Sequence, residues 1–482
     1  LGSRVNPSGL IEDVELLGSE EVNCGSFDCA NPDGVWNRGT GWGVSGGTAT
    51  YDGSGGTQAI NQTIANIQLG TLCKVTFDVL SNQGSGANTI FLGGTVVNGS
   101  HLDVGSYTFY GSFTSNTNLY IYGRSNEVFE IDNVSVKEAT IDGLARVDYT
   151  DGTASLLVEP QRTNVITYSE DFTESVWVLF DGGTGVSPIV TSNYAISPDG
   201  TQNATRIQFN INGGTTSTDR SYIRYNSFSS QTDYYYACYI KSANSQEQKL
   251  LWHHGGDDNE FTVTTEWQRV ELDRNGFAET FAGFSLRGNN STVDTSDVLV
   301  WGFQVERGSY PTSYIKTQGS SVTRNQDEYT KTGISDKINS EEGVLFAEIK
   351  KDKGTQFSLI SLDKSSDSDN YIYVGYLNDT TTLRAQIKIN SSIVLDEDID
   401  IGNTNVFSKV AVKYKSGDYA FFINGSKVGN TSTSTDSFSN GDLDRLELGY
   451  DLNSIFKFYG NLRQLQVYNT ALSDSELATL TT

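Results

Sequence analysis

Pairs of carboxylates are the pattern in this sequence that comes nearest to a catalytic site. Glycoside hydrolases built on β-sandwiches use Glu-x-Asp-x-x-Glu on one strand, so that alternate side chains share a face and supply an acid and a nucleophile. The segment "EIDNVS" places Glu130 and Asp132 correctly but has Ser135 where the final Glu belongs. Residues 271–276 ("ELDRNG") end in Gly, and residues 397–400 ("EDID") lack the spacing. The sequence therefore predicts no hydrolysis by this route and no enzyme.

The histidines make a weaker case for a metal site or a catalytic base. The sequence has three, namely His101 and the adjacent His253 and His254. Neighbouring residues on a strand point to opposite faces, so this pair cannot readily chelate one ion. One of them could combine with Asp257 or Asp258, but we expect a polar loop there. No nucleophile-elbow sequence supports Ser/His/Asp catalysis.

Aromatic residues offer a third kind of chemistry, the binding of sugars. A β-sandwich usually binds a sugar through an exposed aromatic plane, with Asn, Asp, Gln or Arg around it for the hydroxyl groups. The alternative for each candidate is a place in a hydrophobic core, which we expect for Trp267 and Trp301 because they lie in alternating strands. The candidate carbohydrate-binding residues are Trp36, Trp42, Tyr51, Trp177 and Trp252.

The composition indicates that strands, not helices, position these groups. The chain has 482 residues with 49 Gly, 25 Tyr and 23 Phe, and it lacks the Ala/Leu/Glu/Lys-rich blocks of helical proteins. Segments such as residues 74–79 ("KVTFDV") and 128–136 ("VFEIDNVSV") alternate apolar and polar residues between turn-forming residues. The sequence therefore predicts an all-β chain of three tandem antiparallel β-sandwiches.

The net charge of the chain restricts which kinds of partner it can bind. The formal net charge is −26, and no basic cluster interrupts the acidity, so nucleic acid and anionic membranes would be repelled. No apolar run approaches the roughly 18 residues of a membrane span, and residues 1–10 lack the basic and apolar regions of a signal peptide. We therefore expect no nucleic-acid partner, no membrane insertion and no signal peptide in these residues.

Four cysteines are too few for a disulfide scaffold. Cys24 and Cys29 flank a turn-like "GSFD" and could form a local disulfide. Cys73 and Cys238 lie in strand-like runs without a Cys or His partner at zinc-like spacing, so we expect buried thiols.

Two regions of the sequence repeat one pattern. The segments "FEIDNVSVKE" and "LVWGFQVERG" share an alternating apolar face, and "CGSFD" followed by Trp36 loosely matches "YSEDF" followed by Trp177. We therefore expect two diverged copies of one sandwich. The matched apolar pairs are Ile131 with Val300, Val134 with Phe303 and Val136 with Val305.

The segment "LLVEPQRTN" (residues 156–164) stands between these copies. It could be a catalytic loop built around Glu159 and Arg162, or a connector. Pro160 biases the preceding Glu159 to an extended backbone, which favours the connector.

A third set of strands begins after the polar residues 317–335. The Asn424-Gly425 dipeptide between "FFI" and "SKV" predicts a tight hairpin, and Ser473 and Glu476 have the spacing of a capping box that begins a short helix. The predicted parts are an N-terminal arm (1–20), a first jelly roll (21–140), a connector (141–163), a second jelly roll (164–316), a linker (317–335) and a third sandwich (336–482).

These residues resemble known families. "GSFD…GVWNRGTGWGVSGGTATYDGSGG…IDNVSV" resembles the carbohydrate-binding-module jelly rolls that recur in bacteriophage tail and fibre proteins, and "LLVEPQRTNVITYSEDFTESVW…GFQVERGSYPTSYIKTQGSSVTR" is similar to a segment repeated in phage virion proteins. "FFINGSKVG…YGNLRQLQVYNTALSDSELATL" resembles the concanavalin A-like, laminin G-type lectin domain. The resemblance implies a virion protein with two carbohydrate-binding-like jelly rolls and one lectin-like domain.

The resemblance also suggests a structural calcium ion. It implies no cofactor that the protein would need in order to function. In carbohydrate-binding jelly rolls a structural ion could join Asp28 near the first strand to Asp132 on the last. A loop of the third region, residues 362–370, offers Asp363, Asp367 and Asp369. The alternative at both places is a solvated acidic turn.

Together these observations predict a non-enzymatic protein on the exterior of a bacteriophage particle. It would be a tail-fibre or head-fibre component, a homotrimer by family expectation, that contacts other virion proteins and binds host cell-surface glycans. Two alternatives stay open: a structural decoration or collar protein that binds no sugar, and a secreted bacterial lectin or accessory carbohydrate-binding protein.

Overall fold

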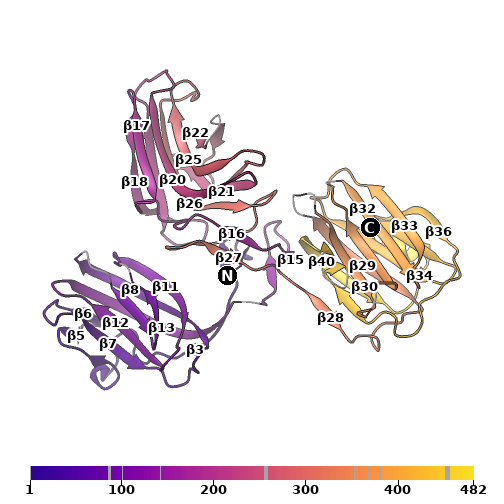
Figure 1. The fold of residues 1–482 in the computed structure, drawn as a ribbon, viewed down its shortest axis with the longest axis horizontal. Coiled ribbons are helices and arrows are strands. Elements are labelled where there is room, and N and C mark those ends of the chain that lie inside the picture. Colours follow the sequence, from indigo (N-terminus) through magenta and orange to yellow (C-terminus); the bar gives the residue numbers. More distant parts are fainter. Residues whose placement is uncertain are drawn as a thin grey trace. The chain divides into compact units, whose positions relative to one another are not determined.

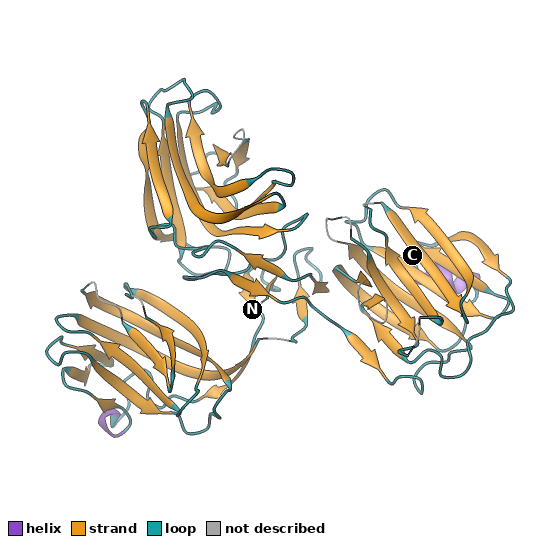
Figure 2. Cartoon of the chain, in the orientation of Figure 1, coloured by secondary structure: helices purple, strands orange, loops and turns teal. Residues whose placement is uncertain are grey.

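The computed structural model describes residues 2–84, 88–99, 101–141, 143–254, 259–351, 354, 356–366, 368–379, 381–450 and 456–482. Over these residues the regular structure is strand, apart from one α-helix and one short 3-10 helix (Figure 2). The all-β prediction is confirmed. Alternating apolar residues bury one side of each strand, which gives sheets and leaves no helical stripe.

The chain divides into two compact units. Glu15–Leu144 form one unit, and Leu1–Val14 with Ala145–Thr482 form the other. The predicted N-terminal arm is therefore shared between them. Its strands β1 (Ser3–Val5) and β2 (Ile11–Asp13) pair with each other in the larger unit, while β3 (Leu16–Glu20) pairs with a strand of the smaller unit.

The smaller unit is the first sandwich. Two antiparallel sheets enclose one core, which includes the buried thiol of Cys73. The five-stranded sheet has the order β4 (Asn37–Arg38), β7 (Gln58–Thr63), β12 (Asn118–Gly123), β9 (Thr89–Leu92) and β10 (Thr95–Asn98). The other sheet has the order β5 (Trp42–Ser45), β6 (Thr48–Tyr51), β13 (Val128–Thr140), β8 (Leu72–Gln83) and β11 (Gly105–Ser112), with β3 beside β13; η1 (Pro32–Gly34) precedes β4.

The second sandwich lies in the larger unit (Figure 1). Its two sheets again enclose a single core, with the thiol of Cys238 inside. The first sheet has the order β17 (Trp177–Gly182), β20 (Arg220–Gln231), β25 (Glu279–Arg287), β22 (Gln248–His253) and β23 (Glu260–Val263). The second has the order β18 (Val186–Ala195), β19 (Ala204–Asn210), β26 (Thr295–Arg307), β21 (Tyr234–Ser242) and β24 (Gln268–Asp273).

The two sandwiches have one strand order. The five-stranded sheets correspond strand for strand, β4-β7-β12-β9-β10 to β17-β20-β25-β22-β23, and the last strand of each copy, β13 or β26, takes the same place in the second sheet. Both last strands also contain a bulge at the same point, where Asn133 (φ 53°) and Gly302 (φ 65°) adopt the left-handed conformation. The strand order and the bulge support the predicted duplication.

The connector holds a buried ionic cluster around Glu159. Its carboxylate accepts hydrogen bonds from Arg146 (2.7 Å), Arg324 (2.5 Å) and the Ser313 hydroxyl (2.6 Å), while its backbone N–H donates to Asp327 (2.8 Å). Burial alone would raise the pKa of Glu159, but the two arginines lower it to about 2. Glu159 ties together segments far apart in the sequence, as the connector interpretation requires.

The connector and the predicted linker both contain strands. β14 (Arg146–Asp148) and β15 (Ser155–Val158) pair with each other, and β15 extends a sheet of the third sandwich. β16 (Arg162–Asn164) pairs with β27 (Val322–Arg324).

The third sandwich has two larger sheets. Its helix α1 (Asp474–Leu480) begins at the predicted capping box of Ser473 and Glu476, and Leu477 packs on the outer side of the first sheet. The first sheet has the order β14, β15, β40 (Gly460–Tyr468), β29 (Glu342–Lys351), β34 (Ser408–Lys415), β35 (Tyr419–Ile423) and β36 (Ser426–Ser432). The second has the order β28 (Thr330–Thr332), β37 (Arg445–Glu447), β30 (Ser358–Asp363), β31 (Tyr371–Tyr376), β32 (Thr382–Ile389) and β33 (Ser392–Asp400); β38 (Gly449–Tyr450) and β39 (Phe456–Lys457) pair separately.

Candidate functional site

The structure buries every aromatic residue predicted to bind sugar. Trp36 is 1% exposed, Trp42 6%, Tyr51 0%, Trp177 4% and Trp252 3%. A sugar ring can stack only on an accessible aromatic face, so the expectation of exposed rings is wrong for all five. They belong to the cores of the first and second sandwiches.

Trp36 and Trp177 show why such residues are buried. The indole N–H of Trp36 donates to the carbonyl of Cys24 (2.9 Å), and that of Trp177 donates to the carbonyl of Tyr168 (3.0 Å). The two tryptophans are therefore equivalent in the duplicated fold. Each fills the core and donates to a carbonyl of the first loop, the loop of its sandwich that contains Cys24 or Tyr168. This is a structural role.

The opposite side of the same strands carries a different set of rings. His253 follows Trp252 on β22, and because neighbouring strand residues alternate, it faces away from the core. Tyr222 on β20 stacks between His253 (4.2 Å between ring centres) and Phe180 of β17 (4.8 Å). The intervening strand β25 contributes the small Gly283 and Ser285 at these levels, which leaves room for the stack.

Arg224 lies in the middle of this outer face. Its guanidinium is 5.3 Å from the ring centre of Tyr222 and 4.6 Å from that of Phe281. Among the described residues, the Arg224 guanidinium has no ion pair, and its Nε is buried without a hydrogen-bond partner. Phe180 is 43% exposed, so the outer end of the ring stack is open to solvent.

The first sandwich has aromatic rings on the corresponding outer face. Tyr120 and Tyr122 of β12 are stacked at 6.0 Å, and Phe91 of β9 lies edge-on to Tyr120 at 6.1 Å. All three rings are half-buried. Leu119 and Ile121, which alternate with the two tyrosines along β12, point the other way and fill the core.

Amide groups accompany Tyr120 of the first sandwich. Asn61 of β7 lies directly opposite Tyr120, and Asn37 of β4 lies opposite Asn61. Asn118 donates to the Tyr120 hydroxyl at 3.0 Å. Rings flanked by amides and guanidinium groups are the components of a carbohydrate site.

The third sandwich has a less accessible aromatic group. Tyr371 and Tyr373 are buried under Tyr450, with ring-centre distances of 4.7 Å and 5.2 Å. Arg384 beside them makes a two-pronged ion pair with Asp398, at 2.5 and 2.6 Å. Neither the rings nor this arginine is open to a ligand.

A cavity of about 540 Å³ opens within the larger unit. Trp267 lines it, but the cations around it are engaged. Arg4 pairs with Glu12 (2.7 Å), Lys350 with Asp151 (2.6 Å), and Arg269 donates to the carbonyl of Thr312 (2.6 Å). This cavity is therefore a weaker candidate than the outer faces.

The calcium candidates do not converge on a site. Among the described residues, no group of three or more His, Cys, Asp or Glu side chains is placed to hold a metal ion. Asp363 is buried against Arg445 (2.7 Å), and Asp369 contacts Lys388 (3.4 Å). Burial raises the pKa of Asp363 against the opposing effect of Arg445.

The remaining metal candidates lie elsewhere. Asp28 accepts from the Ser26 hydroxyl at 2.5 Å, and Asp132 accepts from the backbone N–H of Asn133 at 2.7 Å. Asp367 lies outside the described residues, as do Asp257 and Asp258, the proposed partners of the adjacent histidines.

Sequence reasoning missed the outer-face residues, which are Phe180, Tyr222, Arg224, His253 and Phe281 in the second sandwich and Phe91, Tyr120 and Tyr122 in the first. The signal was the strand alternation itself. Trp177 and Phe180, like Trp252 and His253, lie on opposite faces of one strand, and the larger ring belongs to the core.

Residues 345–478 match the Laminin_G_3 family model, described as the concanavalin A-like lectin/glucanases superfamily. The third sandwich is a concanavalin A-like, laminin G-like domain. The match covers less than a third of the chain. No curated protein sequence matches.

Three solved structures show more distant likenesses. The Ruminococcus gnavus IT-sialidase CBM40 bound to α2,3 sialyllactose is 20% identical, with 32% of this chain and 94% of that chain covered and a TM-score of 0.28. A heptameric SAP-like pentraxin from Limulus polyphemus is 17% identical (30% and 70% covered, TM-score 0.25). Domain 4 of the arabinanase AbnA from Geobacillus stearothermophilus, in complex with arabinotriose, is 13% identical (67% and 100% covered, TM-score 0.20). Similarity this low assigns no function.

Cys24 and Cys29 form a disulfide. Disulfides persist in oxidising surroundings such as the cell exterior, so this bond indicates an extracellular protein. No helix among the described residues is long and apolar enough to cross a membrane.

Proposed function

We propose that the protein is a non-enzymatic, extracellular glycan-binding protein, and that the outer faces of its two five-stranded sheets are the binding surfaces. The observation that carries this proposal is repetition. Two sandwiches of one strand order both place aromatic rings on the face of the same sheet that points away from the core, beside amide or guanidinium groups. In the second sandwich the accessible ring is Phe180, 43% exposed, because Tyr222 and His253 beneath it are 6% exposed each; in the first, Tyr120 is half-buried. An exposed ring adds nothing to the packing of the core, whereas a bound sugar ring stacks on one.

Each face would bind weakly, through contact with a ring and a few hydrogen bonds. Two faces on one chain, and several chains on one particle, would raise the avidity by a factor of about 10² or more. A repeated surface polysaccharide is the kind of ligand that rewards this arrangement.

The biological setting proposed for this binding is attachment of a bacteriophage to its host. In that setting the chain is a tail-fibre or head-fibre component on the virion exterior, contacts other virion proteins and forms a homotrimer. The support for this setting is the resemblance of residues 156–177 and 302–324 to segments of phage virion proteins. None of the matches reported above is to a phage protein, so the virion setting is a prediction.

A structural virion protein that binds no sugar is the second candidate. One observation favours it: all five aromatic residues predicted as sugar platforms are buried. On this alternative the outer rings would contact neighbouring proteins.

A glycan array with the purified full chain, run with calcium and with chelator, tests the proposal. Phe180→Ala and Tyr120→Ala should each weaken binding by about tenfold, the effect of losing roughly 1.4 kcal/mol of ring contact. Tyr194→Ala is the matched control, because Tyr194 is 46% exposed on the opposite sheet of the second sandwich. A correctly folded sample that binds no host-derived glycan would support the structural role instead.

A further inference from the structure

We infer that the outer face of the second sandwich selects acidic sugars, and that Arg224 binds their carboxylate or sulfate group. This inference rests on the proposed function and adds the chemical class of the ligand. The cations discussed above at the other places are engaged: Arg384 of the third sandwich binds Asp398, and Arg4 and Lys350 of the cavity bind Glu12 and Asp151.

The guanidinium of Arg224 is fixed in place by two aromatic rings and is suited to bind an anion. Most arginines in an acidic chain find a carboxylate, and this chain carries a net charge of −26. The Arg224 guanidinium instead packs against Tyr222 and Phe281, which orient it without neutralising it, and no ion pair of Arg224 is found in the described part of the chain. A planar guanidinium fixed in this way is suited to bidentate contact with a carboxylate or sulfate.

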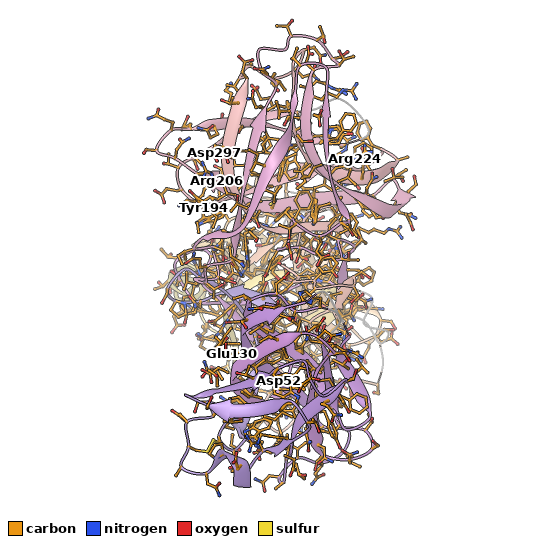
Figure 3. All side chains as sticks on the ribbon, turned by 90° about the vertical axis from the view of Figure 1, so that its left-hand side faces the viewer. Asp52, Glu130, Tyr194, Arg206, Arg224 and Asp297 are labelled. Carbon is orange, nitrogen blue, oxygen red and sulfur yellow. A yellow bond between two sulfur atoms is a disulfide. The ribbon has the colours of Figure 1, made fainter. Side chains whose placement is uncertain are left out.

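Arg206, on the opposite sheet, is the internal comparison. It also lies over a ring, 4.8 Å from the centre of Tyr194, but both of its prongs bind Asp297, at 2.8 and 2.5 Å. Figure 3 shows Arg206, Asp297 and Tyr194 together on one side of the sandwich and Arg224 on the other. The fold therefore neutralises one ring-stacked arginine, while the other has no acidic partner among the described residues.

Ser285 lies beneath the ring stack of this face. It faces the same side of the sheet as Tyr222, directly opposite it in register, and is 2% exposed. Among the described residues its hydroxyl has no hydrogen-bond partner.

The register places no side chain directly opposite Arg224. The residue directly opposite it on β25 is Gly283, which has no side chain. Ser285 is the diagonal neighbour of Arg224, at a separation typical of about 7 Å for such pairs. The Tyr222–His253 ring stack covers this part of β25, so the guanidinium, and not the Ser285 hydroxyl, is the group placed to contact a ligand.

In the first sandwich an amide stands at the position of Arg224. Asn37 follows Trp36 as Val178 follows Trp177, and the strand neighbours of these residues are Asn61 and Arg224. Asn61 therefore occupies the position of Arg224. An amide hydrogen-bonds neutral hydroxyl groups, so the inference applies to the second sandwich alone.

Matched probes test the charge on the unaltered protein. Trigalacturonic acid and its methyl ester differ only in the carboxylates, and 3′-sulfolactose and lactose differ only in the sulfate. Short probes limit repulsion by the acidic chain. Titration calorimetry with the full chain should show at least tenfold tighter binding of one acidic probe than of its neutral form, and the pair that responds identifies carboxylate or sulfate.

Variants then assign the effect to Arg224. Arg224→Gln should lower the ratio of acidic-probe affinity to neutral-probe affinity about tenfold. Arg224→Lys should retain part of this ratio, and Arg206→Gln should leave it unchanged. Circular dichroism on each variant checks folding; if Arg224→Gln is unfolded, the comparison between probes on the wild type still decides. Equal binding of acidic and neutral probes would overturn this inference while the proposed glycan binding stands. Binding to no glycan of the array would overturn both.

Discussion

The first and second sandwiches share their interior and differ on their outer faces. The interior keeps one strand order, one bulge at Asn133 or Gly302, and one tryptophan that donates to the first loop. On the outer faces, Asn61 stands where Arg224 stands, and Tyr120 where Gly283 stands. Packing density restricts what a core position can hold, whereas a solvent-facing position is limited only by what it must contact.

The comparison also separates two ways of holding the first loop. In both copies the bulged strand donates a backbone hydrogen bond to that loop, from Val134 to Gly25 (2.9 Å) and from Phe303 to Ser169 (2.8 Å). The first sandwich adds the Cys24–Cys29 disulfide, and the second adds the hydroxyl contact of Ser169 with Tyr314 (2.6 Å). A shared backbone contact is therefore reinforced by different side chains.

The shared interior is tested most strongly by Trp36→Ala and Trp177→Ala. Each removes a buried indole from an equivalent place, so each should lower the free energy of unfolding of its own sandwich by about 3–5 kcal/mol. Hydrogen exchange read by mass spectrometry should show faster exchange in β13 for the first variant and in β26 for the second. A variant that lost glycan binding at unchanged stability would instead restore the tryptophan to a binding role.

Acid should distinguish the larger unit from the smaller. Glu159 has a pKa of about 2 in the folded chain against an ordinary value of 4.5, so its stabilising effect is complete above about pH 4.5 and is lost as pH falls toward 2. Glu159→Gln at neutral pH should cost about 3 kcal/mol, because Arg146 and Arg324 stay buried without their shared carboxylate.

Hydrogen exchange as a function of pH checks this prediction. In the wild type, the backbone amides of strands β14 to β16 and β27 should exchange faster below about pH 4. The protection of residues 15–144 should not change over the same pH range. The same pH dependence in Glu159→Gln as in the wild type would contradict the assignment to Glu159.

The smallest expected effect belongs to the disulfide. Cys24 and Cys29 close a short loop, for which the loss of chain entropy predicts about 2 kcal/mol of stabilisation. Replacing both residues by Ser should lower the unfolding free energy of the first sandwich by that amount and leave the second unchanged. Thermal unfolding of the double variant, with reduced wild type as the control, measures it. No change would mean that the bond from Val134 to Gly25 suffices to hold the loop.

Features that depend on near neighbours in the chain could be predicted from the amino-acid order. Alternation predicted the strands, and Asn424 and Gly425 form the expected hairpin with positive φ values of 46° and 82°. The capping box at Ser473 is also confirmed, and the strand order supports the predicted match between the two copies. A turn, a cap and a repeat are each encoded over a few residues.

The packing of the sheets determines which side of each strand faces water and which distant groups meet. Alternation shows that Trp252 and His253 point apart, but not which of them is inside, since that depends on the sheet packed against the strand. The partner of Glu159, Arg324, comes from 165 residues further along the chain. Arg224 and Arg206 differ for the same reason: a neighbouring strand supplies the carboxylate of Asp297 to Arg206, and the described strands beside Arg224 supply none.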